Sequence, residues 1–279
     1  MNFTLLLTYG RTGSTAFMRA LSAHPAFVVS EPFPYEVRLV QYILATQSCP
    51  VPAGFAPVTV GNAEYRAVLP GNQTLLDAAK TAFAESGDYS QKAQAGYGVI
   101  AAAQQKSRPE IILEKGFGLN LAPTILQTWP GSRSVILLRD PRSAFFSIKS
   151  FNKKRGYLSF GEANGDEFLF NSIVQYYMSA RKLLAQFLDE GRILEVRYEE
   201  MMANPDEFFS RIVSFHGIPV DPDEIIGMEA AVTLADHHTE GHQTSNQSRS
   251  IARWEDDAED DHRSIFSSRA RELALLGYQ

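Results

Sequence analysis

The stretch that decides how the chain folds is LLLTYGRTGSTAFM, residues 5–18. Its three leucines form an apolar run, and a helical pattern of apolar residues begins at Phe17 and Met18. Between them lie two glycines, Gly10 and Gly13, which allow the backbone to turn tightly. This order predicts a buried strand, then a tight turn, then the N-terminus of a helix.

The predicted turn has the chemistry of a site for a phosphate-like anion. The first N–H groups of a helix have no partner inside the helix, and they carry partial positive charge. Ser14 and Thr15 add hydroxyls and Arg11 adds a planar cation, so residues 9–15 can surround an anion. The stretch differs from a Walker A loop, because it lacks the lysine of the Gly-Lys-Ser/Thr signature. The alternative is a turn that only joins a strand to a helix.

Length and composition limit the class of protein. The 279 residues suffice for one large domain, or for one domain with an insertion, and 44% hydrophobic residues supply a sizeable core. The net charge of −6 argues against a general nucleic-acid binder. The single cysteine, Cys49, excludes an internal disulfide and favours a reducing compartment. We find neither a signal peptide nor a segment that would span a bilayer, so we expect a cytoplasmic protein.

Short apolar runs alternate with helical patterns along much of the chain. After the first strand, buried strands are expected at residues 27–29, 111–113, 134–138 and 193–196. This alternation predicts an α/β fold of three layers, in which a parallel β-sheet is flanked by helices on both faces.

Two helices and one irregular block are expected around these strands. Asp140 and Pro141 predict a helix start, with the aspartate as N-cap and the proline as the first helical residue. An apolar stripe over residues 168–187 predicts a long helix. We expect residues 1–279 to form a single domain, in which residues 46–110 are an insertion that faces the substrate.

A polar residue follows each of the five expected strands. In chain order these residues are Arg11, Glu31, Lys115, Arg139 and Tyr198. Ligands of parallel sheets bind beyond the carboxyl ends of the strands. We therefore expect the five side chains to line one cleft.

Four segments, in order, resemble the sulfotransferases that use 3′-phosphoadenosine 5′-phosphosulfate (PAPS). Residues 9–15 resemble the loop that binds the 5′-phosphosulfate of the donor. Residues 135–142 (VILLRDPR) resemble the motif that binds its 3′-phosphate, in which an arginine acts with a serine eight positions later. Residues 197–219 are also similar to the family, and residues 251–254 (IARW) resemble a loop that covers the donor.

The resemblance implies a P-loop-like sulfotransferase fold and a set of donor-binding residues. That set is Arg11, Thr12, Gly13, Ser14, Thr15, Arg139, Ser147, Tyr198, Arg249 and Arg253. Some of these residues have structural alternatives. Arg139 can instead pair with Asp140, Tyr198 can be a core residue, and Arg253 can pair with the acidic run 255–261.

The resemblance also implies the catalytic residues Arg11, Lys115 and Glu31. The two cations would neutralise the leaving oxygen, although arginine stands where many family members carry lysine. Members that act on alcohols often use a histidine as base where this chain has Phe117. Branches that act on carbohydrates or tyrosine use a glutamate after the first helix, so we expect Glu31 to be the base, with Glu36 as its rival.

Three further alternatives stay open at this point. Lys115 can be a surface residue paired with Glu114, and Glu31 can be an ordinary solvated carboxylate. The three histidines within residues 236–242 could bind a metal, but their spacing is irregular and the implied reaction needs none. We therefore expect no metal.

The implied function is transfer of a sulfuryl group from PAPS to a hydroxyl or amine, which releases 3′-phosphoadenosine 5′-phosphate (PAP). A carbohydrate or small metabolite is the expected acceptor, with no nucleic-acid partner and no membrane span. The alternatives are a kinase-like nucleotide-binding enzyme and a non-catalytic binder of 3′-phosphoadenosine nucleotides. Neither the acceptor nor the oligomeric state follows from the sequence.

Overall fold

A computed structural model describes residues 1–30, 35, 38–41, 78, 81–82, 85, 87–116, 119–233 and 251–279. In this part of the chain, one sheet contains β1 (Asn2–Leu7), β2 (Phe27–Val29), β3 (Ile111–Lys115), β4 (Arg133–Leu138) and β5 (Ile193–Arg197). The strand order is β2-β3-β1-β4-β5, and every pairing is parallel. The expected parallel α/β sheet is confirmed.

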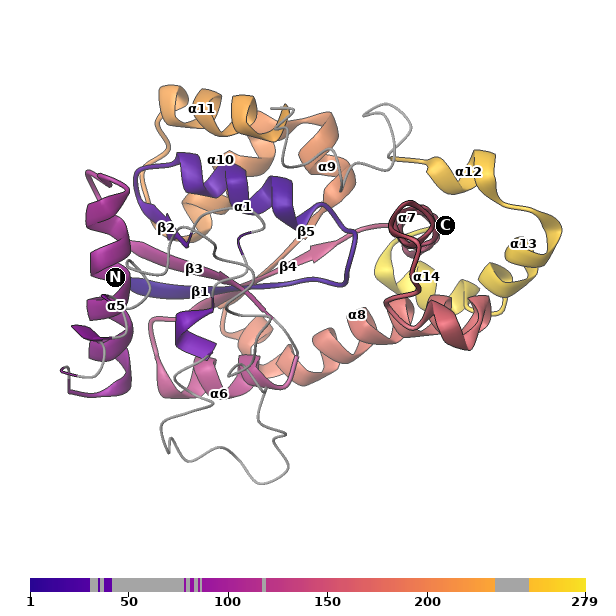
Figure 1. Ribbon diagram of the computed structural model, residues 1–279, viewed down its shortest axis with the longest axis horizontal. Coiled ribbons are helices and arrows are strands. Elements are labelled where there is room, and N and C mark those ends of the chain that lie inside the picture. The colour runs from indigo at the N-terminus through magenta and orange to yellow at the C-terminus, as the bar shows by residue number, and fades with distance from the viewer. Residues whose placement is uncertain are drawn as a thin grey trace.

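Helices cover both faces of the sheet and give three layers (Figure 1). One face carries α1 (Ser14–Ala23), α9 (Tyr198–Ala203), α10 (Pro205–Phe215) and α11 (Pro222–Thr233). The other carries α5 (Tyr89–Ala103), α6 (Leu121–Thr128) and α8 (Asp166–Asp189), with α13 (Asp260–Ser267) and α14 (Ala270–Leu276) packed on α8. Helix α7 (Pro141–Arg155) lies beyond the carboxyl edge of the sheet, where Figure 1 shows it end-on. The short helices η1 (Glu162–Asn164) and α12 (Arg253–Asp257) contact α8 and α7, respectively.

The strands are apolar on both sides because both faces of the sheet are buried. Successive side chains of a strand point to opposite faces. Leu5 and Leu7 of β1 therefore join the core under α5, α6 and α8, whereas Leu6 joins the core under α1, α10 and α11. Such continuous apolar runs are typical of parallel sheets.

Part of the block 46–110 belongs to the core. Ala93, Tyr97 and Ile100 of α5 are buried in the same cluster as Leu5. The rest of the block lies mainly outside the described residues, so the insertion that we expect there stays a prediction.

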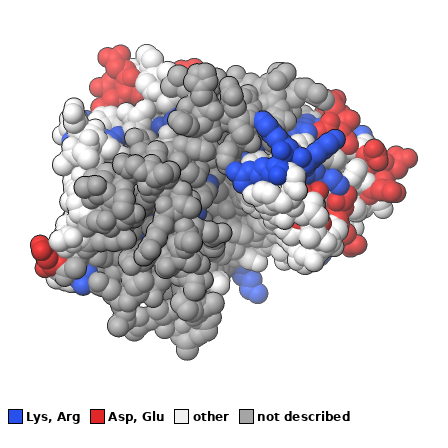
Figure 2. Space-filling view, in the orientation of Figure 1, with Lys and Arg blue, Asp and Glu red and all other residues white. Residues whose placement is uncertain are grey.

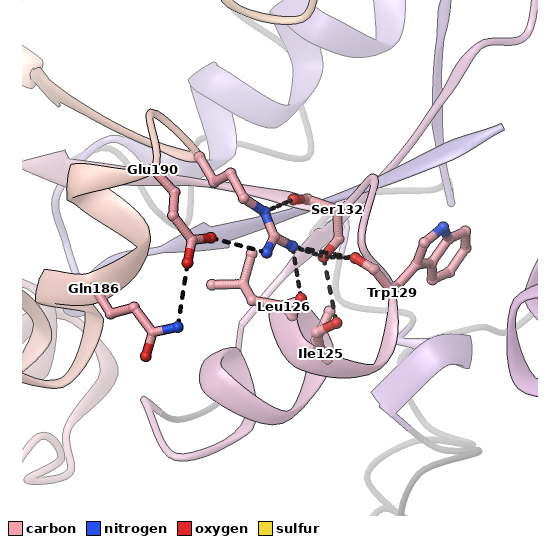
Figure 3. Close-up of polar contacts among 7 residues, drawn as sticks. Ile125, Leu126, Trp129, Ser132, Gln186 and Glu190 are labelled. Atoms are coloured by element: carbon pink, nitrogen blue, oxygen red, sulfur yellow. Dashed lines mark hydrogen bonds and ion pairs between the residues drawn. The ribbon is translucent and has the colours of Figure 1, made fainter.

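A polar cluster fixes the amino ends of β4 and β5. The guanidinium of Arg192 donates to the carbonyl oxygens of Leu126 at 2.6 Å and Trp129 at 3.2 Å. It also donates to the carbonyl of Ser132 at 3.1 Å and lies 3.3 Å from the Glu190 carboxylate. Figure 3 shows these partners converging from α6, the following turn and the end of α8. The last carbonyls of a helix have no partner within it, and a cation there also stabilises the helix dipole.

A neutral histidine joins β1 to α10. Nε2 of His216 lies 2.8 Å from the Thr4 hydroxyl, and its Nδ1 lies 3.1 Å from the Ile212 carbonyl. Because a carbonyl only accepts, Nδ1 carries the proton and Nε2 accepts from Thr4. The rings of Phe27 and Phe215 lie 5.2 and 5.1 Å from the imidazole. His216 is half-buried, and its removal from solvent lowers its pKa to about 3.

We predict that His216 makes the fold sensitive to acid. Its pKa is about 3 in the folded chain and about 6.5 when unfolded. The contribution of His216 to the free energy of unfolding is therefore complete at a pH above its unfolded pKa. It is lost as the pH falls towards its folded pKa. From this residue alone, the free energy of unfolding should fall by about 1–2 kcal/mol between about pH 7 and about pH 5. Urea titrations should show a smaller loss for His216→Gln, and equal losses would contradict the prediction.

Candidate active site

The turn after β1 lies at the carboxyl ends of the neighbouring strands β1 and β4, where the connections of the sheet change direction. We call this position the crevice. From β1 the chain passes through α1 to β2 on one side, and from β4 it passes through α7 and α8 to β5 on the other. Open parallel sheets bind ligands at such a reversal of direction. Arg11 lies in the turn after β1 and Arg139 directly follows β4, so both cations lie at this crevice.

Two glycines of the turn make room for other parts of the chain. A Cβ atom on Gly13 would lie 2.3 Å from Cδ2 of Tyr198, and one on Gly10 would lie 2.1 Å from Cε1 of Phe160. Gly13 also has φ +87°, which favours glycine. Helix α1 begins at the next residue, Ser14. Its first N–H groups are therefore at the carboxyl edge of the sheet, where they can bind an anion.

The Thr12 hydroxyl stiffens the turn. Thr12 is fully buried, and its Oγ1 donates to the Tyr9 carbonyl at 2.9 Å. It also contacts the hydroxyl of Thr8, which in turn donates to the Leu137 carbonyl of β4 at 3.1 Å. These bonds tie the turn to the neighbouring strand. The hydroxyl of Thr12 is therefore engaged within the protein. The contact that we expect between Thr12 and the nucleotide is left to the backbone N–H of this residue.

Arg139 connects the two sides of the crevice. Its Nη1 donates to the carbonyl oxygen of Arg11 at 2.8 Å, and its guanidinium carbon lies 4.5 Å from the centre of the Tyr198 ring. The residue is 4% exposed, and burial lowers the pKa of its guanidinium, while nearby Tyr198 and Glu199 oppose that shift. The alternative pairing of Arg139 with Asp140 is not the one adopted.

Asp140 pairs with Arg142 instead. Its carboxylate accepts from Nη2 of Arg142 at 2.7 Å and from Nε at 3.0 Å. The same carboxylate accepts from the Arg142 backbone N–H at 2.9 Å and so caps α7. The expected helix start at Asp140 and Pro141 is confirmed.

Arg11 and Arg155 share one aromatic ring. Their guanidinium carbons lie 4.3 and 4.4 Å from the centre of the Phe151 ring, which belongs to α7. Contact with the face of an aromatic ring stabilises a cation. Burial lowers the pKa of Arg11 to about 10, and repulsion from Arg139, Arg155 and Arg253 adds to the shift. A site that crowds guanidinium groups in this way favours a bound anion.

The surface around this site is locally basic although the chain is acidic. Figure 2 shows Lys and Arg side chains gathered over the end of α7 and Asp and Glu side chains beside them. The basic residues of the last turn of α7 are Lys153, Lys154 and Arg155. The acidic residues include those in the first turns of α12 and α13.

One face of α7 is covered by the segment that leads into α12. Ser143 donates to the Ile251 carbonyl at 3.1 Å, and Arg253 contacts the hydroxyl of Ser150. Ser147 lies between these two contacts along the helix and is 3% exposed. The structure thus brings Arg253 to the helix that carries Ser147.

Arg253 forms the ion pair that was considered as its structural alternative. Its Nε lies 2.7 Å from the carboxylate of Asp257, which belongs to the acidic run 255–261. Burial lowers the pKa of both Arg11 and Arg139, and the positive charge of Arg253 adds to both shifts.

Tyr198 begins α9 directly after β5 and is 8% exposed. Its ring packs between Gly13 and Arg139. It is therefore a buried part of the crevice wall.

Lys115 ends β3 next to the Leu6 position of β1. Its neighbour Glu114 faces the opposite side of the sheet, where it accepts from Val40 N at 2.6 Å and the Tyr97 hydroxyl at 2.7 Å. Burial raises the pKa of Glu114, and these hydrogen bonds oppose the rise. Strand alternation puts Lys115 on the α1 side, so the alternative pairing with Glu114 is not adopted.

Some predicted residues lie outside those described. They are Glu31, Glu36, Phe117, Arg249 and the histidines within 236–242. Within the described ranges, no group of three or more His, Cys, Asp or Glu residues could hold a metal ion. No helix of those ranges is both long enough and apolar enough to cross a bilayer.

The structure also shows functional candidates that sequence reasoning missed. Phe151 and Arg155 flank Arg11, and Thr8 supports the turn. The sequence carried one signal for Phe151 and Arg155. They follow the arginine motif and are four residues apart, so they are neighbours on the surface of α7.

Comparisons with known proteins agree on the fold. A predicted protein-tyrosine sulfotransferase of Caenorhabditis briggsae is 24% identical over 288 residues, spanning 99% of this chain and 90% of the relative. The sulfotransferase of Alicyclobacillus acidocaldarius has a TM-score of 0.54 at 14% identity, covering 100% of this chain and 97% of that one. The mouse sulfotransferase SULT7A1, solved in complex with PAP, has a TM-score of 0.53 at 10% identity and covers 100% and 89%.

The structural likenesses establish the P-loop-like sulfotransferase fold. The family assignment comes from a model of the sulfotransferase family, which matches residues 5–222, well over half of the chain. The protein therefore belongs to the sulfotransferase family.

Proposed function

We propose that the protein transfers a sulfuryl group from PAPS to a hydroxyl or amine of a carbohydrate or small-metabolite acceptor. The observation that carries the proposal is the 2.8 Å hydrogen bond from Arg139 Nη1 to the Arg11 carbonyl oxygen. This bond joins the turn after β1 to Arg139 at one crevice. A donor with anions at both its 5′ and 3′ positions matches a site that has cations on both sides. That a mouse member of the fold was solved with PAP supports this assignment.

In this proposal the two ends of the donor have separate binding groups. The turn, with Gly13, Ser14 and Thr15 at the start of α1, holds the 5′-phosphosulfate. Arg139 and Ser147 hold the 3′-phosphate, because a guanidinium fork and a hydroxyl match the oxygens of a terminal phosphate. Tyr198, Arg249 and Arg253 complete the nucleotide site.

The reaction is an in-line displacement at sulfur, similar to phosphoryl transfer. The acceptor oxygen or nitrogen bonds to sulfur while the bond from sulfur to the bridging oxygen breaks, and the electron pair of the broken bond stays on the 5′-phosphate of the product PAP. Arg11 and Lys115 stabilise the charge on that leaving oxygen. Glu31 takes the acceptor proton.

Turnover with labelled PAPS tests the proposal. The protein should transfer label to at least one member of a panel of sugars, phenols, alcohols and amines, and should release PAP. Binding of PAP without transfer to any acceptor would support a non-catalytic binder instead. Transfer from ATP that requires magnesium would support a kinase.

We predict that Glu31→Gln lowers turnover about 100- to 10,000-fold, because the acceptor proton loses its base. PAP affinity by calorimetry should stay unchanged. Glu36→Gln is the matched control and should retain activity. If the two variants exchange these results, Glu36 is the base, and full activity in both would remove a glutamate base from the mechanism.

We predict that Arg139→Lys weakens PAP binding about 10- to 100-fold, because lysine keeps the charge but loses the guanidinium fork. Arg133→Lys is the control, since Arg133 begins the same strand and lies 4.9 Å from the Phe215 ring, far from the crevice end. Calorimetry with PAP should show a loss only in the first variant. Equal affinity in the two variants would contradict the role of Arg139.

A further inference from the structure

The carboxylate of Glu199 binds the backbone next to Arg139. Its Oε1 accepts from the backbone N–H of Asp140, the residue after Arg139, at 2.9 Å. Its Oε2 accepts from the hydroxyl of Tyr278 at 3.3 Å, from 79 positions along the chain. Burial lowers the pKa of Arg139, and Tyr198 and the Glu199 carboxylate oppose that shift. The Asp140 carboxylate is bound to Arg142 instead.

Tyr278 is held firmly in this position. It is 8% exposed, and the guanidinium carbon of Arg197 lies 4.6 Å from the centre of its ring. Arg197 also donates to the Leu276 carbonyl at 2.7 Å, and the Tyr278 N–H donates to the Leu273 carbonyl at 2.9 Å. A Cβ atom on Gly277 would lie 2.4 Å from Nη2 of Arg197, so the segment packs closely on the end of β5.

Burial raises the pKa of both groups in this contact. Burial raises the pKa of Tyr278, so its hydroxyl remains a donor. Burial also raises the pKa of Glu199, while the hydrogen bond from Asp140 and the charge of Arg139 oppose the rise. A hydrogen bond from Tyr278 further stabilises the ionised carboxylate.

We propose that Tyr278 and Glu199 are positioning residues for the 3′-phosphate site. Tyr278 orients Glu199, and Glu199 fixes the backbone at Asp140 and balances the charge of Arg139. Neither side chain touches the donor. The inference rests on the proposed function, because it assumes that Arg139 binds the 3′-phosphate.

According to the proposal, a change at Tyr278 affects only the binding of the 3′-phosphate end of the donor. PAP carries a 3′-phosphate and adenosine 5′-monophosphate (AMP) does not, whereas both carry the 5′-phosphate. A change that displaces Arg139 weakens PAP binding and leaves AMP binding unchanged. A change that loosens the whole nucleotide site weakens both.

The test compares dissociation constants for PAP and AMP by calorimetry on the full chain. Tyr278→Phe removes only the hydroxyl, so the fold should be retained. We expect it to weaken PAP binding about three- to tenfold, the range for one hydrogen bond, with AMP binding unchanged. In turnover, the KM for PAPS should rise by the same factor while kcat stays constant.

Two further variants sharpen this test. Glu199→Gln should reduce the preference for PAP over AMP at least as much as Tyr278→Phe, because it also removes the negative charge beside Arg139. Leu275→Ala is the control, since that side chain is 57% exposed on the same segment, and it should leave the preference unchanged.

The outcomes separate this inference from the proposed function. An unchanged preference in Tyr278→Phe and Glu199→Gln, with PAP still bound, would overturn the positioning role alone. Equal weakening of PAP and AMP would overturn it too, because that result indicates a structural role. If the wild-type chain fails to bind PAP, the proposed function fails and the inference fails with it.

Discussion

The hydrogen bond from Arg139 to the Arg11 carbonyl holds the two halves of the site together. It spans the crevice between β1 and β4, and it joins residues 128 positions apart at 2.8 Å. Burial lowers the pKa of Arg11 to about 10, and repulsion from Arg139 and the other nearby arginines adds to the shift. Cations are held this way at a cost in stability, and an anion bound between them offsets that cost. The arrangement is therefore better suited to binding than to stabilising the empty fold.

The surrounding elements keep this crevice in shape. The hydroxyls of Thr8 and Thr12 fasten the turn to β4, while the Tyr198 ring packs closely against Gly13. On the other side, α7 supplies the ring of Phe151 under the guanidinium of Arg11. Ile251 and Arg253, far along the chain, contact α7. Tyr278 contacts Glu199, which accepts from the N–H of Asp140 at the start of that helix. The site is thus assembled from segments that lie far apart along the chain.

Local signals predicted the fold and the main cations. Apolar runs, the turn at Gly10 and Gly13 and the cap at Asp140 are properties of neighbouring residues, so the parallel sheet and the start of α7 follow from the sequence. The separate faces of Glu114 and Lys115 could also have been predicted, because neighbouring residues of a strand point in opposite directions.

Contacts between distant segments left no such signal. Glu199 meets Tyr278 from 79 positions away, and nothing near either residue indicates that meeting. The Thr12 hydroxyl is a different case: it fits the pattern of an anion ligand, yet the local geometry of the turn directs it to Thr8 and Tyr9. Likewise, the alanine-rich helix α5 lay in a block expected to face substrate, but the fold buries Tyr97 against Glu114 of β3.

A crystal structure with bound PAP tests the central claim most directly. The account predicts the 5′-phosphate in the turn at residues 10–15 and the 3′-phosphate within hydrogen-bonding distance of Arg139 and Ser147. PAP bound away from the β1–β4 crevice, or bound with its 3′-phosphate remote from Arg139, would contradict it.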